Sequence, residues 1–195
     1  MPKTLLILDL DETLIHAAEE PLPGLEPDFI LWNHYYVYKR PFLKEFIDIC
    51  AQHFELAIWS SASSDYVNKI VKTIIPKEVE LAFIWSRKKC TFGTYPVSYL
   101  ESSGLAYDHY DLPRVWFKKL EKVKKRGYSL NKILIVDNSP EKVFYNYGNA
   151  IYVDDFTGNT NDQELVFLSK YLPTLHAVEN VRTLEKRGWK TTLNE

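Results

Sequence analysis

The clearest indication of the fold is the stretch LLILDLDETL at residues 5–14. Its first four residues are all apolar, which is typical of a central strand buried on both faces of a parallel sheet. Two acids, Asp9 and Asp11, follow directly, and because successive side chains of an extended chain alternate, both are expected on the same side. They would repel each other without a shared cation, and Mg²⁺ suits that position. An exposed acidic turn is the alternative, which this apolar context disfavours.

The composition is that of one globular domain spanning residues 1–195. With 46% hydrophobic residues the chain can bury a sizeable core, and a second independent domain is not expected. A formal net charge of −2 gives no general attraction to nucleic acid or to anionic membranes. The two cysteines, Cys50 and Cys90, do not form a C-x-x-C pair, so neither a disulfide framework nor a zinc site is expected. The sequence has no recognisable signal peptide or membrane-spanning stretch, and we expect a cytoplasmic location, or a nuclear one in a eukaryote.

Further apolar runs, each short enough to be a buried strand, alternate with helical patterns along the chain. This alternation predicts right-handed crossovers and a doubly wound α/β fold, that is, a Rossmann-like parallel sheet covered on both faces. Such sheets bind ligands at the carboxyl ends of their strands. The expected strands are 56–59, 82–85, 133–136 and 151–153. Three helices are expected: one after Arg40-Pro41, one after Ser63-Ser64, and one that runs roughly from Val115 to Arg126.

Polar residues follow three of these strands, at the edge where a ligand is expected. All three sets are predicted to converge on one crevice. Alone, the segment 137–140 would fit an ordinary capped turn, but beside the two acids we interpret it as part of a site. The residues are Asp9, Asp11 and Thr13 after the first strand, Ser60 and Ser61 after the second, and Asp137-Asn138-Ser139-Pro140 after the fourth.

This ordered set resembles the phosphatases of the haloacid dehalogenase superfamily. Within them it is similar to the NLI-interacting-factor branch, which includes the small phosphatases acting on the RNA polymerase II C-terminal domain. The resemblance covers most of the chain up to about Tyr171 and implies a haloacid dehalogenase-type sheet with a flap after the first strand and a small insertion after the third. It rests on D-L-D-E-T-L, a serine after the second strand, a later lysine and D-N-S-P, with further support from His16, Lys39-Arg40-Pro41-Phe42, Arg87 with Cys90, and Asp162-Gln163-Glu164-Leu165.

The resemblance also implies the chemistry: a Mg²⁺-dependent phosphomonoester hydrolase with an aspartyl-phosphate intermediate. Asp9 is expected to attack phosphorus, since a carboxylate is ionised at neutral pH and needs no base to activate it. Asp11 is expected to protonate the departing alcohol and then to deprotonate the attacking water. The metal is expected on Asp9, on Asn138 and on the backbone carbonyl of Asp11. Thr13, Ser60, Arg87 and Lys118 are expected to bind phosphate or substrate, and Asp137 to lie just outside the metal ligands, pairing with Lys118.

Three assignments stay open at this point. The family's Lys-Asp-Leu reads Lys118-Lys119-Leu120 here, so either lysine fits the motif. Arg87 could contact phosphate or simply pair with an acid. Asp154-Asp155, after the last strand, could reach the metal, although a loop or cap role is the simpler interpretation.

Two segments are expected to set the choice of substrate. The flap, about residues 15–38, is interpreted as an aromatic-rich hairpin beside the site, and the insertion, about residues 90–114, as a cap over the entrance. An aromatic groove suits an extended phosphopeptide but would also stack a sugar or a base. The basic residues between 122 and 126 are interpreted as a solvated helix face, and residues 174–195 have no assigned role.

The expected substrate is phosphoserine or phosphothreonine in a protein, with no direct nucleic-acid or membrane partner. One alternative keeps the catalysis but acts on a small phosphorylated metabolite, and another transfers the phosphoryl group to an acceptor other than water. An alternative of a different class is a phosphoprotein-binding or scaffolding module without turnover. Because Asp9, Asp11 and the D-N-S-P motif are all present, turnover is favoured.

Overall fold

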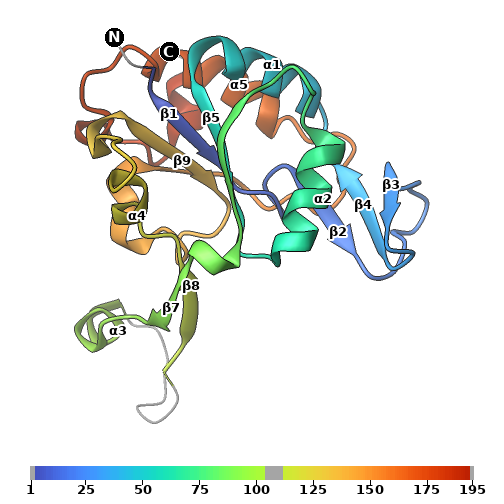
Figure 1. Ribbon diagram of the computed structural model, residues 1–195, viewed down its shortest axis with the longest axis horizontal. Helices are drawn as coiled ribbons and strands as arrows, with labels where there is room; N and C mark the ends of the chain where they lie inside the picture. Colours follow the sequence, from blue (N-terminus) through green and yellow to red (C-terminus); the bar gives the residue numbers. More distant parts are fainter. Residues whose placement is uncertain (1–2, 104–111, 194–195) are drawn as a thin grey trace.

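The computed structural model describes residues 3–103 and 112–193 and has a five-stranded parallel sheet at its centre (Figure 1). The strand order is β10-β9-β1-β5-β6, so the first apolar run forms the middle strand and pairs with a neighbour on each side. All four residues of β1 are completely buried, which explains the lack of polar alternation. The predicted doubly wound α/β fold is confirmed. The strands are β1 Leu5–Leu8, β5 Glu55–Trp59, β6 Leu81–Trp85, β9 Ile133–Asp137 and β10 Ala150–Tyr152.

Helices cover both faces of this sheet, as the sequence predicts. On one face, even-numbered residues of β1 such as Leu6 and Leu8 pack against α1 (Leu43–His53), α2 (Ser64–Ile74) and α5 (Glu164–Leu175). On the other face, Leu5 and Ile7 pack in a second core with Leu120 and Val123, at the short helix α4 (Glu121–Lys124). The two expected helices after Arg40-Pro41 and Ser63-Ser64 are therefore α1 and α2.

The helix expected from Val115 to Arg126 is wrong over its first half. Residues Arg114–Phe117 form strand β8, which pairs antiparallel with β7 (Thr91–Thr94), and helix begins only at Glu121. The physical reason is the contiguous run Val115-Trp116-Phe117, whose branched and aromatic side chains favour a strand and lack helical spacing. Lys118 thus follows a strand and does not lie in a helix.

Two smaller units project from the central sheet, and Figure 1 shows one on the right and one at the bottom. The segment after β1 forms a three-stranded antiparallel sheet in the order β2-β4-β3, one strand more than a hairpin. Its strands are β2 (Ile15–Ala18), β3 (Phe29–Leu31) and β4 (Tyr35–Lys39). The second unit is the β7-β8 ribbon with helix α3 (Val97–Ser103); residues 104–111 of the expected insertion lie outside the described residues.

The segment after α5 packs back onto the central unit through η4 (Val181–Thr183) and η5 (Trp189–Leu193). The Trp189 indole N–H donates to the Tyr152 carbonyl at 2.8 Å, and its ring stacks on Tyr171 with centroids 5.3 Å apart. This segment, without a role in the sequence analysis, therefore completes the core next to β10. None of the described helices is both long and apolar enough to span a membrane.

Candidate active site

The ends of three neighbouring strands bring the predicted polar residues together. Leu8, the last residue of β1, pairs with Ile58 of β5 on one side and with Val136 of β9 on the other. The residues that follow these strands therefore meet at one edge of the sheet. The Asp9 backbone N–H still donates to the Val136 carbonyl at 3.0 Å, so Asp9 is held by the parallel ladder itself.

A tight turn then carries the chain from Asp9 to β2. The Leu10 carbonyl accepts hydrogen bonds from the backbone N–H groups of Leu14 and Ile15, at 2.8 and 3.1 Å. Glu12 has a φ of 57°, in the left-handed region that non-glycine residues seldom adopt. This turn sends Asp11 forward to the crevice.

Arg40 holds the back of this turn. Its buried guanidinium donates to the Thr13 carbonyl at 3.0 Å and makes a two-pronged pair with Asp162, at 2.9 and 2.8 Å. Such planar pairing is strong and fixes geometry. The K-R-P-F and D-Q-E-L segments singled out in the sequence thus meet each other and hold the turn that carries Asp11.

Asp9 lies in a buried cluster of alternating charges. The Lys118 ammonium nitrogen is 2.9 Å from Asp9 Oδ1 and 2.6 Å from Asp137 Oδ2, and the Lys142 ammonium is 3.5 Å from Asp9 Oδ2. Burial raises the pKa of Asp9, but the charges of Lys118 and Lys142 outweigh it and the pKa is lowered. Burial and the Asp9 charge raise the pKa of Asp137 to about 6. Asp9 therefore stays ionised to a lower pH than an ordinary aspartate, whereas Asp137 takes up a proton at a higher pH.

Asp11 lies in a different environment on the same turn. Burial raises its pKa, a hydrogen bond from Tyr66 partly offsets this, and the Asp9 charge raises the pKa again, so the net shift is upward. The Tyr66 hydroxyl donates to Asp11 Oδ1 at 2.5 Å, and the buried Ser60 hydroxyl lies 3.4 Å from Asp11 Oδ2. Two carboxylates with opposite pKa shifts are what a nucleophile and a proton donor require.

Asn138 and Thr13 form the next part of the crevice. The Asn138 backbone N–H donates to the Thr13 hydroxyl at 3.2 Å, and this hydroxyl donates to Asn138 Oδ1 at 3.3 Å. Asn138 Nδ2 donates to Asp155 at 2.8 Å, so Asp155 orients the amide, whereas Asp154 pairs with Lys190. In the described part of the chain there is no group of three His, Cys, Asp or Glu side chains that could hold a metal.

The oxygen donors of the crevice nevertheless fit Mg²⁺. Two of the oxygen ligands expected from the sequence, those of Asp9 and Asn138, directly follow the neighbouring strands β1 and β9. The third expected ligand is the backbone carbonyl of Asp11. Mg²⁺ is typically bound by one or two carboxylates, with water and substrate phosphate completing its coordination. A mixed set of this kind matches that preference better than it matches Zn²⁺, which binds Cys and His.

The structure places Lys118 and Lys119 in different surroundings. Lys118 is 1% exposed and bridges two carboxylates, whereas the Lys119 ammonium lies 4.1 Å from the centre of the Tyr145 ring.

Arg87 lies apart from Asp9 and Asp11. Its Nε donates to the Ser61 carbonyl, and its guanidinium covers the Trp116 ring at 5.6 Å. Arg87 is exposed and marks the rim of the crevice, beside Ser60.

Two residues of this site do not appear among the sequence-based predictions. Lys142 follows D-N-S-P by two positions, and the turn that begins at Pro140 brings it back to Asp9; its carbonyl also accepts the Lys118 N–H at 2.7 Å. Tyr66 lies in the first turn of α2, after the Ser60 segment. The only sequence signal for either is its nearness to a recognised motif.

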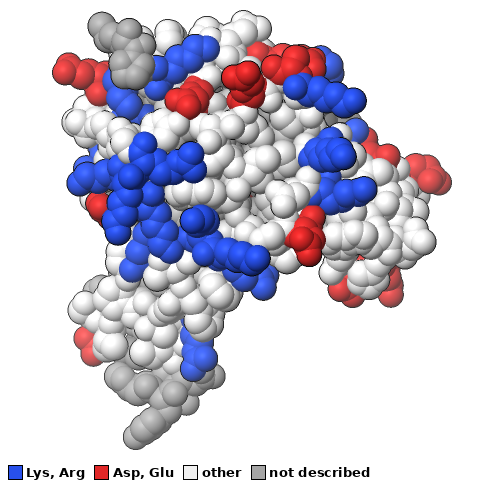
Figure 2. All heavy atoms as spheres, in the orientation of Figure 1, with Lys and Arg blue, Asp and Glu red and all other residues white. Residues whose placement is uncertain are grey.

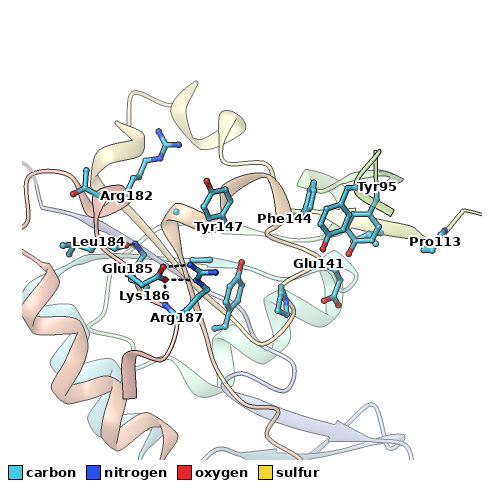
Figure 3. A pocket seen from close by; sticks show the side chains of 17 residues that line it. Tyr95, Pro113, Glu141, Phe144, Tyr147, Arg182, Leu184, Glu185, Lys186 and Arg187 are labelled. Atoms are coloured by element: carbon cyan, nitrogen blue, oxygen red, sulfur yellow. Dashed lines mark hydrogen bonds and ion pairs between the residues drawn. The ribbon is translucent and has the colours of Figure 1, made fainter. Parts of the chain in front are cut away.

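A cavity of about 1000 Å³ lies beside this crevice, between the β7-β8 ribbon, η3 (Phe144–Asn149) and the C-terminal segment (Figure 3). Figure 3 shows Tyr95 and Phe144 at one end and Arg182 at the other, with the Glu185–Arg187 pair between them. Pro140 and Glu141 contribute to its wall, but its described lining includes neither Asp9 nor Asp11. The cavity is thus a neighbour of the crevice and separate from it.

Comparisons with known proteins bear on the family. The model of the family described as NLI interacting factor-like phosphatases matches residues 4–182. A CTD small phosphatase-like protein 2 of Dictyostelium discoideum is 31% identical over 188 residues, covering 93% of this chain and 29% of the relative. The CTD nuclear envelope phosphatase 1B of Danio rerio is 26% identical over 95% of this chain and 72% of its own length. This chain therefore spans less than a third of one relative and most of another.

A solved structure supports the fold. The fission yeast RNA polymerase II CTD phosphatase Fcp1 bound to beryllium fluoride superposes with a TM-score of 0.54 at 16% identity. The match covers 98% of this chain and 51% of that protein. At this identity the likeness shows a shared fold.

Proposed function

This chain belongs to the NLI interacting factor-like phosphatase family, and we propose that it hydrolyses phosphoserine or phosphothreonine esters in proteins. The proposed reaction is Mg²⁺-dependent and passes through a phosphorylated Asp9. The observation that supports it most is the pair of carboxylates on one turn, Asp9 with a lowered and Asp11 with a raised pKa. Opposite shifts of this kind favour a nucleophile that is ionised beside an acid that keeps its proton to a higher pH.

In the first step an Asp9 carboxylate oxygen attacks phosphorus, and the bond from phosphorus to the leaving oxygen breaks. Asp11 gives its proton to that oxygen, so the alcohol leaves neutral. In the second step the ionised Asp11 takes a proton from water, the hydroxide attacks phosphorus, and the acyl-phosphate bond to Asp9 breaks. Asp9 is thereby restored, and Asp11 carries the proton it needs for the next cycle.

The other residues offset charge and fix positions. Lys118 and Lys142 provide the positive charge against which Asp9 and the transferred phosphoryl group are held. The Ser60 hydroxyl lies beside Asp11 and is available to a phosphoryl oxygen. Mg²⁺, held by Asp9, Asn138 and the Asp11 carbonyl, would supply further positive charge to the phosphoryl oxygens.

The aromatic residues of the small antiparallel sheet favour a protein as the substrate. Trp32, at the β3-β4 turn, and Tyr35 of β4 lie against Tyr66, with ring centroids 6.3 and 6.0 Å from it. Because Tyr66 bonds to Asp11, this aromatic surface borders the catalytic acid. Trp32 is 54% exposed, and an open aromatic ring beside the proposed catalytic acid suits an extended peptide better than an enclosed metabolite.

The test measures hydrolysis of p-nitrophenyl phosphate and of a phosphoserine peptide, with Mg²⁺ and with a chelator. Asp9→Asn is expected to abolish turnover with its circular dichroism spectrum unchanged, and Asp11→Asn to slow it by about 10²–10⁴-fold, the usual contribution of general acid–base catalysis. Mass spectrometry of acid-quenched wild type is expected to find phosphate on Asp9. Full activity in either variant contradicts the role assignment, and an inactive but folded wild type with Mg²⁺ favours a binding module.

A further inference from the structure

A band of unpaired basic side chains runs along the surface from the rim of the crevice. Figure 2 shows Lys and Arg gathered over η1 (Arg87–Lys89) and α4, on the left of the view. These two segments lie about 30 residues apart in the sequence and meet only in the fold. We call this surface the basic band; it consists of Arg87, Lys88 and Lys89 on η1 and of Lys119, Lys122, Lys124, Lys125 and Arg126 around α4.

Several cations of the band are held in place by aromatic rings or backbone carbonyls. Lys122 Nζ donates to the carbonyls of Lys89 and Cys90, at 2.8 and 3.0 Å, which joins α4 to η1. The Arg126 guanidinium lies 5.3 Å above the Phe83 ring, and the Lys89 ammonium lies 5.7 Å above Trp85. Such contacts orient cations without neutralising their charge.

No acid offsets this charge among the residues that the structure describes. Their ion pairs include no member of the basic band. Glu121 is the single acid in the two segments. Burial and the neighbouring Lys119, Lys89 and Lys125 lower the pKa of Lys122, as expected where like charges crowd. Since the whole chain carries a formal net charge of −2, the band is a local feature and does not reflect a basic protein.

The band is continuous with the catalytic crevice. At one end of the band Arg87 donates to the Ser61 carbonyl, and the adjacent Ser60 contacts Asp11. A negatively charged chain lying on the band therefore leads directly to the acids. We infer that the basic band binds an acidic stretch of the phosphoprotein substrate itself, a run of Asp, Glu or further phosphorylated residues beside the target residue. This inference rests on the proposed function and names the substrate class for it.

Single-stranded nucleic acid fits the band less well. Its binding depends on bases stacking on free aromatic faces. Phe83 and Trp85 are 6% and 7% exposed, and their rings are already covered by Arg126 and Lys89. The charge of the band is therefore available to a partner, whereas these two rings are not, and an acidic polypeptide needs only the charge.

The experiment compares phosphoserine peptides that share one core sequence. One carries a run of Asp and Glu before the phosphoserine, one carries it after, and the reference has Asn and Gln in the same places. We expect one of the acidic peptides to have a kcat/KM about tenfold above the reference, through KM, as a few exposed charge pairs would produce. Fluorescence anisotropy with labelled peptides on the Asp9→Asn protein measures the same preference without turnover.

A charge-removal variant and a matched control locate the effect. The triple change Lys88→Ser, Lys124→Ser and Lys125→Ser removes three exposed cations of the band, and we expect the preference to fall to about twofold or less. The control, Lys69→Ser, Lys72→Ser and Lys77→Ser, removes three exposed lysines at α2 and is expected to keep the preference. Hydrolysis of p-nitrophenyl phosphate reports folding of both.

The outcomes separate the inference from the proposed function. Equal kcat/KM and equal affinity for all three peptides would overturn the inference, as would a preference that the triple variant retains. Tighter binding of an RNA oligonucleotide or of anionic vesicles than of either acidic peptide would also overturn it. If wild type hydrolyses no substrate, the proposed function fails, and the anisotropy measurement still decides whether acidic peptides bind the band.

Discussion

The molecule uses lysine in two contrasting ways within a short distance of the sheet edge. Lys118 and Lys142 lie inside the crevice, where each is close to a carboxylate of the same chain. Lys124 and Lys125 lie outside on α4, exposed and without an ion pair among the described residues. The first pair of charges is already satisfied and fixes the ionisation of Asp9; the second is open to a partner. Burial and pairing therefore distinguish the lysines that are proposed to act on the phosphoryl group from those that are proposed to bind the substrate chain.

The largest effect is expected from substituting the buried Lys118, in comparison with its neighbour Lys119. Lys118→Met keeps most of the side-chain volume but leaves Asp9 and Asp137 buried without their shared cation. We expect the free energy of unfolding to fall by about 3–5 kcal/mol, the cost of breaking a buried pair. We expect kcat/KM for p-nitrophenyl phosphate to fall by at least about 10²–10³-fold, as for other lost transition-state donors.

Lys119→Met is the matched control. It removes the charge next to Lys118 in the sequence, and this charge contacts the Tyr145 ring and no carboxylate among the described residues. Its free energy of unfolding is expected to change by no more than about 0.5 kcal/mol, as at other surface positions. Urea titration and steady-state kinetics on the two variants measure both quantities. The comparison fails if Lys119→Met is the more damaging change.

The central fold and the meeting of the acids could be predicted from the sequence. Both depend on short-range signals: an all-apolar strand, and polar residues directly after it, which a parallel sheet brings to one edge. The strand β8 could not be separated from the helix that follows, because the run from Val115 to Lys125 is apolar or basic at most positions. Its pairing with β7 is a tertiary property.

The rest of the site depends on contacts between distant segments. Lys142 and Tyr66 belong to no motif pattern, and only the folded turn and helix bring them to Asp9 and Asp11. In the same way, the basic residues of 122–126 read as an ordinary solvated helix face. The nearness of Arg87, Lys88 and Lys89 changes that interpretation, and it follows from the packing of η1 on α4.

A smaller effect is expected from a change beside Asp11, which forms no ion pair with Lys118 or Lys142 among the described residues. The Tyr66 hydrogen bond favours the ionised form of Asp11 and lowers its pKa against the upward shift caused by burial. Tyr66→Phe removes this bond, so the pKa of Asp11 rises further. In the proposed reaction Asp11 is protonated when the alcohol leaves. The value of kcat should therefore fall as pH rises through the pKa of Asp11, and this alkaline limb should move to higher pH in the variant. The direction of this shift follows from the loss of one hydrogen bond to the ionised carboxylate.

The pH profile of kcat for the phosphoserine peptide measures this shift, because its serine oxygen must be protonated as it leaves. Tyr35→Phe is the control, because Tyr35 packs edge-on against Tyr66 at 6.0 Å, whereas the Asp11 carboxylate is hydrogen-bonded by Tyr66 and Ser60. It is expected to leave the limb in place. An unchanged profile in Tyr66→Phe, or a shift to lower pH, contradicts the positioning role of this hydroxyl.

The smallest effect is expected from raising the salt concentration, which changes no residue. Salt screens the exposed lysines far more than the buried ones and so compares the two sets. Raising KCl from about 0.1 M to about 1 M shortens the Debye length from about 10 Å to about 3 Å. The preference for an acidic peptide over its uncharged reference should therefore shrink from about tenfold to about twofold, whereas kcat for p-nitrophenyl phosphate should change by less than about twofold. If both quantities fell together, salt would be acting on the crevice itself, and the exposed lysines could not be treated as a separate recognition surface. If only the peptide preference fell, the two sets of lysines would act independently, one on the phosphoryl group and the other on the chain that carries it.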